Sequence, residues 1–238
     1  MNASRHSYRY YELVMAAFVT VLLCANLIGP AKTCVVTLPL LGSALVFGAG
    51  NIFFPISYIF GDILTEVYGY ARARKVIWAG FGALLFATLM AWLVLHLPVN
   101  PAEPYNAVLQ PALETVFGST TRVVFASLAA FWVGDFVNSY VLARMKVWTT
   151  GRFLWSRTIG STVVGQGIDS LIFYPLAFGN TWDSTTLWRV VAFNWLFKVS
   201  VEIFMTPLTY LIVGWLKRRE NVDHFDRDTK FTPFSLAD

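Results

Sequence analysis

Polar and charged side chains recur at helical spacing within four long apolar stretches of this sequence. Residues three or four apart lie on one face of a helix, so each stretch presents one polar face. The candidate site residues on these faces are Phe54, Tyr58, Asp62, Thr65, Glu66, Asn138, Gln166, Asp169, Asn194, Lys198 and Glu202. A charged group at the centre of a bilayer costs about 2.5 to 3.5 kcal/mol on insertion scales, so each requires a partner, a water-filled cavity or a ligand. Together the four faces predict a central polar site within a membrane bundle.

Lys198 is expected to have an acidic partner, because an ammonium near the middle of a membrane is too costly alone. At about 1.5 Å per residue, Asp169 lies about 15 Å before the short loop at 179–186 and Lys198 about 16 Å after it. We therefore expect Asp169 to pair with Lys198, with Glu202 and Glu66 as the alternative partners. Contacts of this kind also hold bundles together, so each polar residue has a structural interpretation beside the binding one.

Other kinds of chemistry find little support. The chain has no G-x-x-x-x-G-K-[ST], G-x-S-x-G or H-E-x-x-H motif and no metal-ligand spacing, so neither enzyme activity nor a cofactor is expected. Asp62 and Glu66 could serve as the carboxylate pair of an intramembrane enzyme, but no further motif accompanies them. Cys24 and Cys34 are interpreted as packing residues.

The composition indicates an integral membrane protein of one domain, residues 1–238. Apolar residues make up 56% of the chain, which is more than a soluble domain buries, and charged residues make up only 13%. A membrane span needs roughly 20 mainly apolar residues. We predict an all-α bundle of six transmembrane helices, near 11–28, 51–69, 75–97, 120–143, 157–178 and 187–216. The apolar segment between the first two is interrupted by Pro39 and Gly42 and reads as a re-entrant or interfacial hairpin, and a cytoplasmic tail follows at 217–238.

The basic residues predict the orientation of the bundle. With six spans, fourteen of the eighteen lysines and arginines fall on one side, which the positive-inside rule places in the cytoplasm together with both termini. Arg72, Arg74 and Lys75 would anchor the inner end of the second span. A seven-span alternative would force Arg5 and Arg9 outside. Because the basic residues lie in short clusters between apolar runs, the net charge of +4 indicates topology rather than nucleic-acid binding.

One segment has a specific resemblance. The run FFPISYIFGDILTEVYGYARAR resembles the signature of the queuosine precursor transporter family, once classed with vitamin uptake transporters. The similarity continues through RTIGSTVVGQGIDSLIF and FKVSVEIFMTPLTY, and it includes Asn26 and Lys32. Lys32 is accordingly a further candidate, as a gate or a substrate contact.

The resemblance implies a transporter of the cell inner membrane. Its solutes would be 7-cyano-7-deazaguanine and 7-aminomethyl-7-deazaguanine, imported for salvage into tRNA modification. Related members could prefer other 7-deazapurines or queuine, and the coupling ion is left open. The alternative is the substrate-binding membrane subunit of an ATP-driven vitamin-type importer, with separate ATPase chains. The lipid-facing aromatic surface is also compatible with a homodimer.

The candidate side chains suit such a solute. A 7-deazaguanine carries N1–H and its exocyclic amine side by side, and one carboxylate can accept both. Amide or lysine groups can donate to O6, and the flat ring suits Phe54, Tyr58 or Phe173. Nothing here separates a deazaguanine from guanine, so the name of the solute rests on the resemblance alone.

Overall fold

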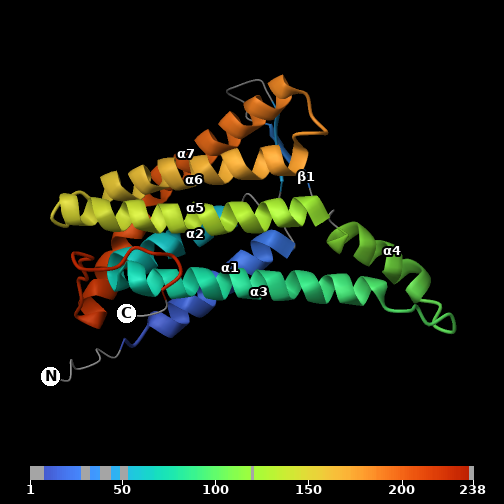
Figure 1. Ribbon diagram of the computed structural model, residues 1–238, viewed down its shortest axis with the longest axis horizontal. Helices are drawn as coiled ribbons and strands as arrows, with labels where there is room; N and C mark the ends of the chain where they lie inside the picture. The colour runs from blue at the N-terminus through green and yellow to red at the C-terminus, as the bar shows by residue number, and fades with distance from the viewer. Residues whose placement is uncertain (1–7, 28–32, 38–43, 49–52, 119–120, 236–238) are drawn as a thin grey trace.

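The computed structural model describes residues 8–27, 33–37, 44–48, 53–118 and 121–235 as a bundle of long helices with a small hairpin beside it (Figure 1). The long helices are α1 (Tyr11–Leu27), α3 (Tyr70–His96), α5 (Thr121–Trp148), α6 (Leu154–Phe178) and α7 (Ser184–Glu220). Shorter elements are α2 (Phe54–Ile63), the π-helical segment η3 (Leu64–Tyr68), α4 (Asn106–Phe117) and the strands β1 (Thr33–Thr37) and β2 (Ala44–Gly48).

The helical membrane class is confirmed. Within the described ranges, three helices are long and apolar enough to cross a membrane: Tyr70–His96, Arg122–Trp148 and Ser184–Glu220. Helix α1 is apolar but has only 17 residues. Five predicted spans correspond to α1, α3, α5, α6 and α7, although α3 begins earlier than expected and α5 and α7 end later. The number of six crossings stays a prediction.

The second predicted span is shorter and less regular than expected. Helix α2 begins at Phe54 with Pro55 in its first turn, where the missing proline N–H has no intrahelical acceptor to lose. It continues as the π-helical segment η3 and ends at Gly69, whose φ is +83°. The backbone angle favours glycine here, and a Cβ at this position would lie 2.2 Å from Cδ2 of His224 and displace that ring.

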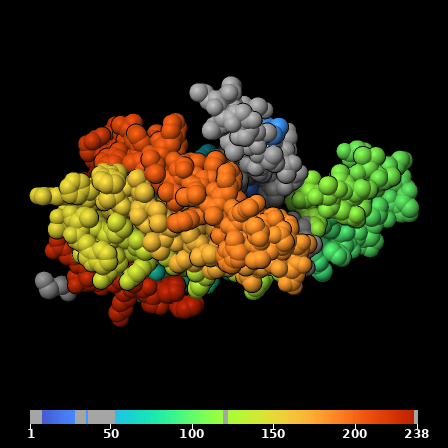
Figure 2. All heavy atoms as spheres, turned by 90° about the horizontal axis from the view of Figure 1, so that it is seen from above, coloured from blue at the N-terminus to red at the C-terminus, as the bar shows by residue number. Residues whose placement is uncertain are grey.

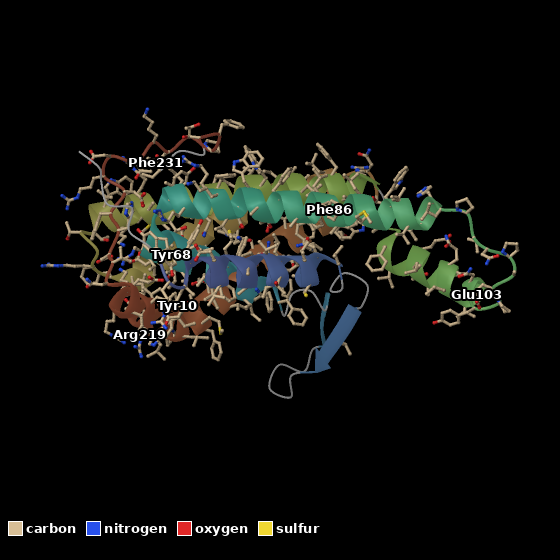
Figure 3. The ribbon with its side chains drawn as sticks, turned by 90° about the horizontal axis from the view of Figure 1, so that it is seen from below. Tyr10, Tyr68, Phe86, Glu103, Arg219 and Phe231 are labelled. Carbon is tan, nitrogen blue, oxygen red and sulfur yellow. The ribbon has the colours of Figure 1, made fainter. Side chains whose placement is uncertain are left out.

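The segment between α1 and α2 contains an antiparallel pair of strands, with Thr33 opposite Gly48 and Thr37 opposite Ala44. Their β-branched residues favour an extended backbone, which departs from the all-α expectation. The connecting residues 38–43 and Lys32 lie outside the described residues. Figure 3 shows the strands projecting away from the helices. Whether this hairpin is re-entrant or interfacial stays a prediction.

Helix α6 and the first part of α7 lie on one side of α5, and α1 and α3 lie on the other (Figure 1). The later part of α7 passes behind α5, and its end lies on the side of α1 and α3. The largest apolar cluster joins Phe18 and Leu22 of α1 to Ile63 and Leu64 at the α2–η3 junction, and to Leu216 near the end of α7. This packing brings α1 and the end of α7 together at the α2–η3 junction. The burial of these side chains also fixes which face of α2 and η3 turns toward α5 and α7.

The loop expected from 98 to 119 contains an additional helix, α4, in which no residue is buried. Helix α4 and the adjoining end of α3 project beyond the rest of the bundle (Figure 2). Glu103 marks this end in Figure 3, and Tyr10 and Arg219 mark the opposite end. The helix was not expected because Pro111 lies inside it and because a segment of 12 residues is too short to cross a membrane.

The beginning of α1 and the end of α7 meet at one end of the bundle. The Glu220 carboxylate accepts hydrogen bonds from the backbone N–H of Arg9 at 2.9 Å and of Tyr10 at 2.7 Å, and from the Tyr68 hydroxyl at 3.0 Å. The residues just before α1 therefore lie beside the last residue of α7, while the placement of both termini in the cytoplasm stays a prediction.

The segment after α7 is docked on the bundle rather than free. Both Asp226 carboxylate oxygens accept from the Tyr70 N–H at 3.1 Å, at the start of α3. The buried Arg74 guanidinium donates to the carbonyls of Lys230 at 2.9 Å and Thr232 at 2.8 Å. Arg74 was expected only to anchor the end of a span, and here it also binds the tail.

Asp226 stays ionised where it is buried. Burial opposes its charged form, but hydrogen bonds from His224, Thr229 and the Tyr70 N–H outweigh this and hold the pKa of the carboxyl below its ordinary value. The carboxylate is also favourably placed at the N-terminus of α3, where backbone N–H groups lack intrahelical acceptors.

Candidate functional site

Lys198 and Asp169 form an ion pair between α7 and α6, as their matched depths predicted. The Lys198 ammonium also donates to Oε1 of Gln166 at 3.0 Å. Gln166 and Asp169 are three residues apart on α6, so both present their side chains to the same part of α7. The Lys198 side chain is 15% exposed and that of Asp169 is 20% exposed, so the pair is only partly closed off from its surroundings.

The aromatic residues of α2 adjoin this ion pair. The Lys198 ammonium lies 5.6 Å from the centre of the Tyr58 ring, a favourable cation–π distance. Phe54 lies one turn before Tyr58, and the two rings are stacked at 6.4 Å with an interplanar angle of 15°. Three helices therefore bring an ammonium, a carboxylate, an amide and a flat aromatic surface together. We call Tyr58, Gln166, Asp169 and Lys198 the Lys198 cluster.

A second polar group lies one helical turn further along α2 and α7. Asp62 is fully buried, and one of its oxygens accepts from Nδ2 of Asn138 at 2.9 Å. Glu202 lies one turn beyond Lys198 and is 3% exposed. Thr65 is engaged nearby, donating to the Gly61 carbonyl at 3.0 Å and lying 3.1 Å from the Ser139 hydroxyl.

Two glycines allow α5 and α6 to approach closely and so position Asn138 and Asp169. A Cβ at Gly165 would lie 2.6 Å from Cβ of Asn138, and one at Gly134 would lie 2.9 Å from Cβ of Asp169. Real Cβ atoms do not tolerate such distances. Small residues at a helix interface permit this packing in membranes, where helices associate through close contact rather than through the hydrophobic effect.

Glu66 lies apart from these groups, although it shares a helical face with Asp62 in the sequence. Arg157 binds both Glu66 oxygens at 2.8 Å, Lys217 lies 2.5 Å away and Lys146 lies 3.4 Å away. Asp223 completes the group, 2.7 Å from both lysines. We call these five residues the Glu66 cluster. The structure thus does not bring Glu66 to the Lys198 cluster, and it makes Glu66 the shared acceptor of three basic side chains.

The basic members of the Glu66 cluster were missed as site residues. Their positions at the ends of apolar runs indicated orientation, and nothing in the sequence links Lys146 or Lys217 to Glu66. The π-helical segment that contains Glu66 was also not expected. Segments of this kind occur often at functional sites.

The remaining candidates lie elsewhere. Asn194 donates to the Val190 carbonyl of its own helix at 3.0 Å. Phe173 packs edge-on against Tyr174 and Phe178, with ring centres at 5.0 and 6.0 Å. No group of three or more His, Cys, Asp or Glu side chains that could hold a metal ion occurs in the described parts of the chain.

Two hollows were found in the bundle. One, of about 10 Å³, is lined by residues that include Tyr58, Asp135, Asn138 and Ser139. It has room for about one water molecule. The other, of about 350 Å³, is apolar and lies between the ends of α1, α3 and α4. Of these two hollows in the described part of the chain, the small one adjoins the polar residues.

Comparison with known proteins identifies the family. Residues 48–212 match the model of a family described as putative vitamin uptake transporters. A protein of Bacillus subtilis (strain 168) named a probable queuosine precursor transporter is 34% identical over 83% of this chain and 81% of its own length. The queuosine precursor transporter of Escherichia coli (strain K12) is 24% identical over 92% of this chain and 94% of its own length. No solved structure gives a significant match.

The family match covers well over half of the chain, and it includes the helices that carry Tyr58, Asp62, Gln166, Asp169 and Lys198. The similar proteins are named as transporters, in agreement with long apolar helices that contain buried polar groups. The chain therefore belongs to the putative vitamin uptake transporter family and is a membrane transporter rather than an enzyme.

Proposed function

We propose that this protein imports queuosine precursors, 7-deazaguanine derivatives such as 7-cyano-7-deazaguanine, across a bacterial inner membrane. The names of the similar proteins from Bacillus subtilis and Escherichia coli support this class of solute. The observation that carries the proposal is the Lys198 cluster, in which a carboxylate, an ammonium and an amide meet beside an aromatic ring. Both signs of charge and a flat surface are then available to a flat polar solute.

Each member of the Lys198 cluster has a role in this proposal. The Asp169 carboxylate accepts the N1–H and exocyclic amine of the solute, a donor pair that suits one carboxylate. The Lys198 ammonium donates to O6, and the ring packs on Tyr58. In the solute-free protein Asp169 and Lys198 satisfy each other, so neither charge is buried alone. When the solute binds, the contact between Asp169 and Lys198 is replaced by one contact from each residue to the solute.

Admission of the solute requires a change in helix packing. Small-molecule sites occupy about 300–1,000 Å³, whereas the cavity beside the polar residues is about 10 Å³. Helices α5 and α6 touch through Gly134 and Gly165 and would move as one unit. We propose that α7 separates from this unit, which opens the contact between Lys198 and Asp169 and exposes both groups to the solute.

The proposed topology has six crossings, by α1, α2 with η3, α3, α5, α6 and α7, and both termini in the cytoplasm. The basic end of the bundle, which includes Arg219, supports this orientation, and Glu103 lies at the opposite end (Figure 3). The segment from α2 to η3 has two short helical pieces, Phe54–Ile63 and Leu64–Tyr68. Short or interrupted spans are typical of the solute site in transporters.

Uptake of labelled 7-cyano-7-deazaguanine into cells that cannot synthesise it tests the proposal. We expect guanine to compete, because it shares the donor pair and O6, and adenine to compete at least tenfold less well. Equal competition by adenine would remove the donor-pair argument. Uptake by the purified chain in proteoliposomes would separate a self-sufficient transporter from a membrane subunit that needs separate ATPase chains.

A further inference from the structure

Two buried carboxyl groups in the middle of the bundle lack a basic partner. Asp62 on α2 is fully buried and Glu202 on α7 is 3% exposed. Asn138 donates to one Asp62 oxygen, whereas the other Asp62 oxygen and Oε1 of Glu202 have no hydrogen-bond partner in the described part of the chain. No Lys, Arg or His nitrogen among the described residues lies within 4 Å of either carboxyl.

The nearest basic groups are already engaged. Lys198, one turn from Glu202, binds Asp169 and Gln166. The three basic residues nearest Glu66 bind that carboxylate instead. The basic residues closest in the helices are therefore paired with Asp169 or Glu66 rather than with Asp62 or Glu202.

The other elements packed around Asp62 bring it no basic partner in the described part of the chain. Helix α5 contributes Asp135 and the neutral Asn138. Glu66 of η3 is the neighbouring acidic residue on the same segment, and its charge is balanced by Arg157, Lys146 and Lys217. Helix α1 carries one charged residue, Glu12, in its first turn. Helix α6 contributes the charged residue Asp169, which forms an ion pair with Lys198.

Two neighbouring carboxylates cannot both stay ionised in such surroundings. An ionised carboxylate without a partner costs several kcal/mol to bury, while its protonated form is neutral and can donate a hydrogen bond. Two acidic groups that share a dry site therefore retain a proton between them, as in the carboxylate pairs of aspartic proteases. Their unpartnered oxygens provide both the place for a proton and the acceptor for its hydrogen bond.

We propose that Asp62 and Glu202 form a proton-binding site and that the proton held there is the coupling ion of transport. The inference rests on the proposed function. Tyr58 and Lys198, which belong to the solute site, lie one turn before Asp62 and Glu202 on the same two helices. A movement of α7 relative to α2 therefore alters both sites at once. The pair that shares one proton carries a single negative charge. A second proton from the outer water neutralises it, travels with the solute and leaves to the inner water when that side opens, which returns the pair to its singly protonated form.

The test uses the purified full-length protein in proteoliposomes, with labelled 7-cyano-7-deazaguanine as the solute and the membrane potential clamped near zero. Solute counterflow without an ion gradient first shows transport itself. A pH gradient of one unit, acid outside, should then raise accumulation up to about tenfold if one proton accompanies each solute. A sodium gradient at equal pH should not raise accumulation of the solute. A pH indicator trapped inside should report acidification when the solute is added.

Two isosteric variants place the proton site. Asp62→Asn and Glu202→Gln imitate the protonated groups, so each should retain counterflow and lose accumulation driven by the pH gradient. Asp228→Asn and Glu114→Gln, at exposed positions of the tail and α4, should behave as the unaltered protein does.

Several outcomes would overturn the inference. Counterflow without solute-dependent acidification in the unaltered protein would exclude proton coupling, whether or not the variants fold. Tenfold accumulation retained by both variants would place the proton elsewhere, and accumulation driven by sodium would replace the ion. Absence of counterflow in the unaltered protein would remove the proposed function itself, which distinguishes that failure from the failure of proton coupling.

Discussion

Replacement of Glu66 with glutamine separates two interpretations of this residue. The carboxylate is fully buried, binds Arg157 through two hydrogen bonds of 2.8 Å and contacts two lysines. Glu66→Gln would leave three basic groups near one another, with Asp223 as the only other acidic member of the Glu66 cluster. Breaking a buried ion pair by removing one partner costs about 3–5 kcal/mol.

This cost corresponds to a shift of about two to four orders of magnitude in the folding equilibrium. We expect a marked loss of monodisperse protein on fluorescence-detected size exclusion after heating in detergent. Asp223→Asn is the matched control in the same cluster. Its side chain is 48% exposed, so its loss should cost at most about 1 kcal/mol. Unaltered heat resistance of Glu66→Gln together with lost solute binding would refute this reasoning and make Glu66 a solute contact.

Three further results are expected. Lys198→Met should be less stable than Lys198→Met combined with Asp169→Asn, and both should be inactive in uptake; strictly additive losses of stability would show that the residues do not interact. Gly165→Ala should reduce folded yield and uptake, since its Cβ would lie 2.6 Å from a Cβ on α5, whereas Gly82→Ala, with open space around it, should be neutral; equal effects would contradict the close-packing argument. The docked tail should resist proteolysis at neutral pH and lose that protection as the pH falls below about 4, because the Asp226 pKa is lowered on folding and its stabilisation disappears on protonation. Asp226→Asn should be cleaved readily at neutral pH too.

Local patterns in the sequence were sufficient for much of the architecture. Apolar length located the long helices, and counting residues from a short loop predicted the contact between Lys198 and Asp169, because rise per residue converts directly to depth in antiparallel neighbours. The partners of Glu66 could not be found in this way. They come from three other helices, and helical periodicity says nothing about which faces of different helices meet.

The docked tail and the π-helical segment were missed for a related reason. Arg74 and Asp226 are separated by 152 positions in the sequence. Arg74 lies beside an apolar run and Asp226 lies in a polar tail, so neither local sequence indicates that the residue is buried. Their burial depends on the turn at Gly69, which brings the start of α3 against the tail. The π-helical segment LTEVY is fully buried, and apolar length and periodicity do not distinguish it from an α-helical continuation of α2.

The docked tail has a consequence for biosynthesis. The tail carbonyls and the Asp226 carboxylate that bind the Arg74 guanidinium and the Tyr70 N–H follow all of the described helices in chain order, so these hydrogen bonds form only after Asp226, Lys230 and Thr232 have been synthesised. Insertion of the helices and completion of this end of the bundle are therefore separate events in time. A chain that ends just after α7 would have all of the described helices but would lack the hydrogen bonds that hold the start of α3 to the tail.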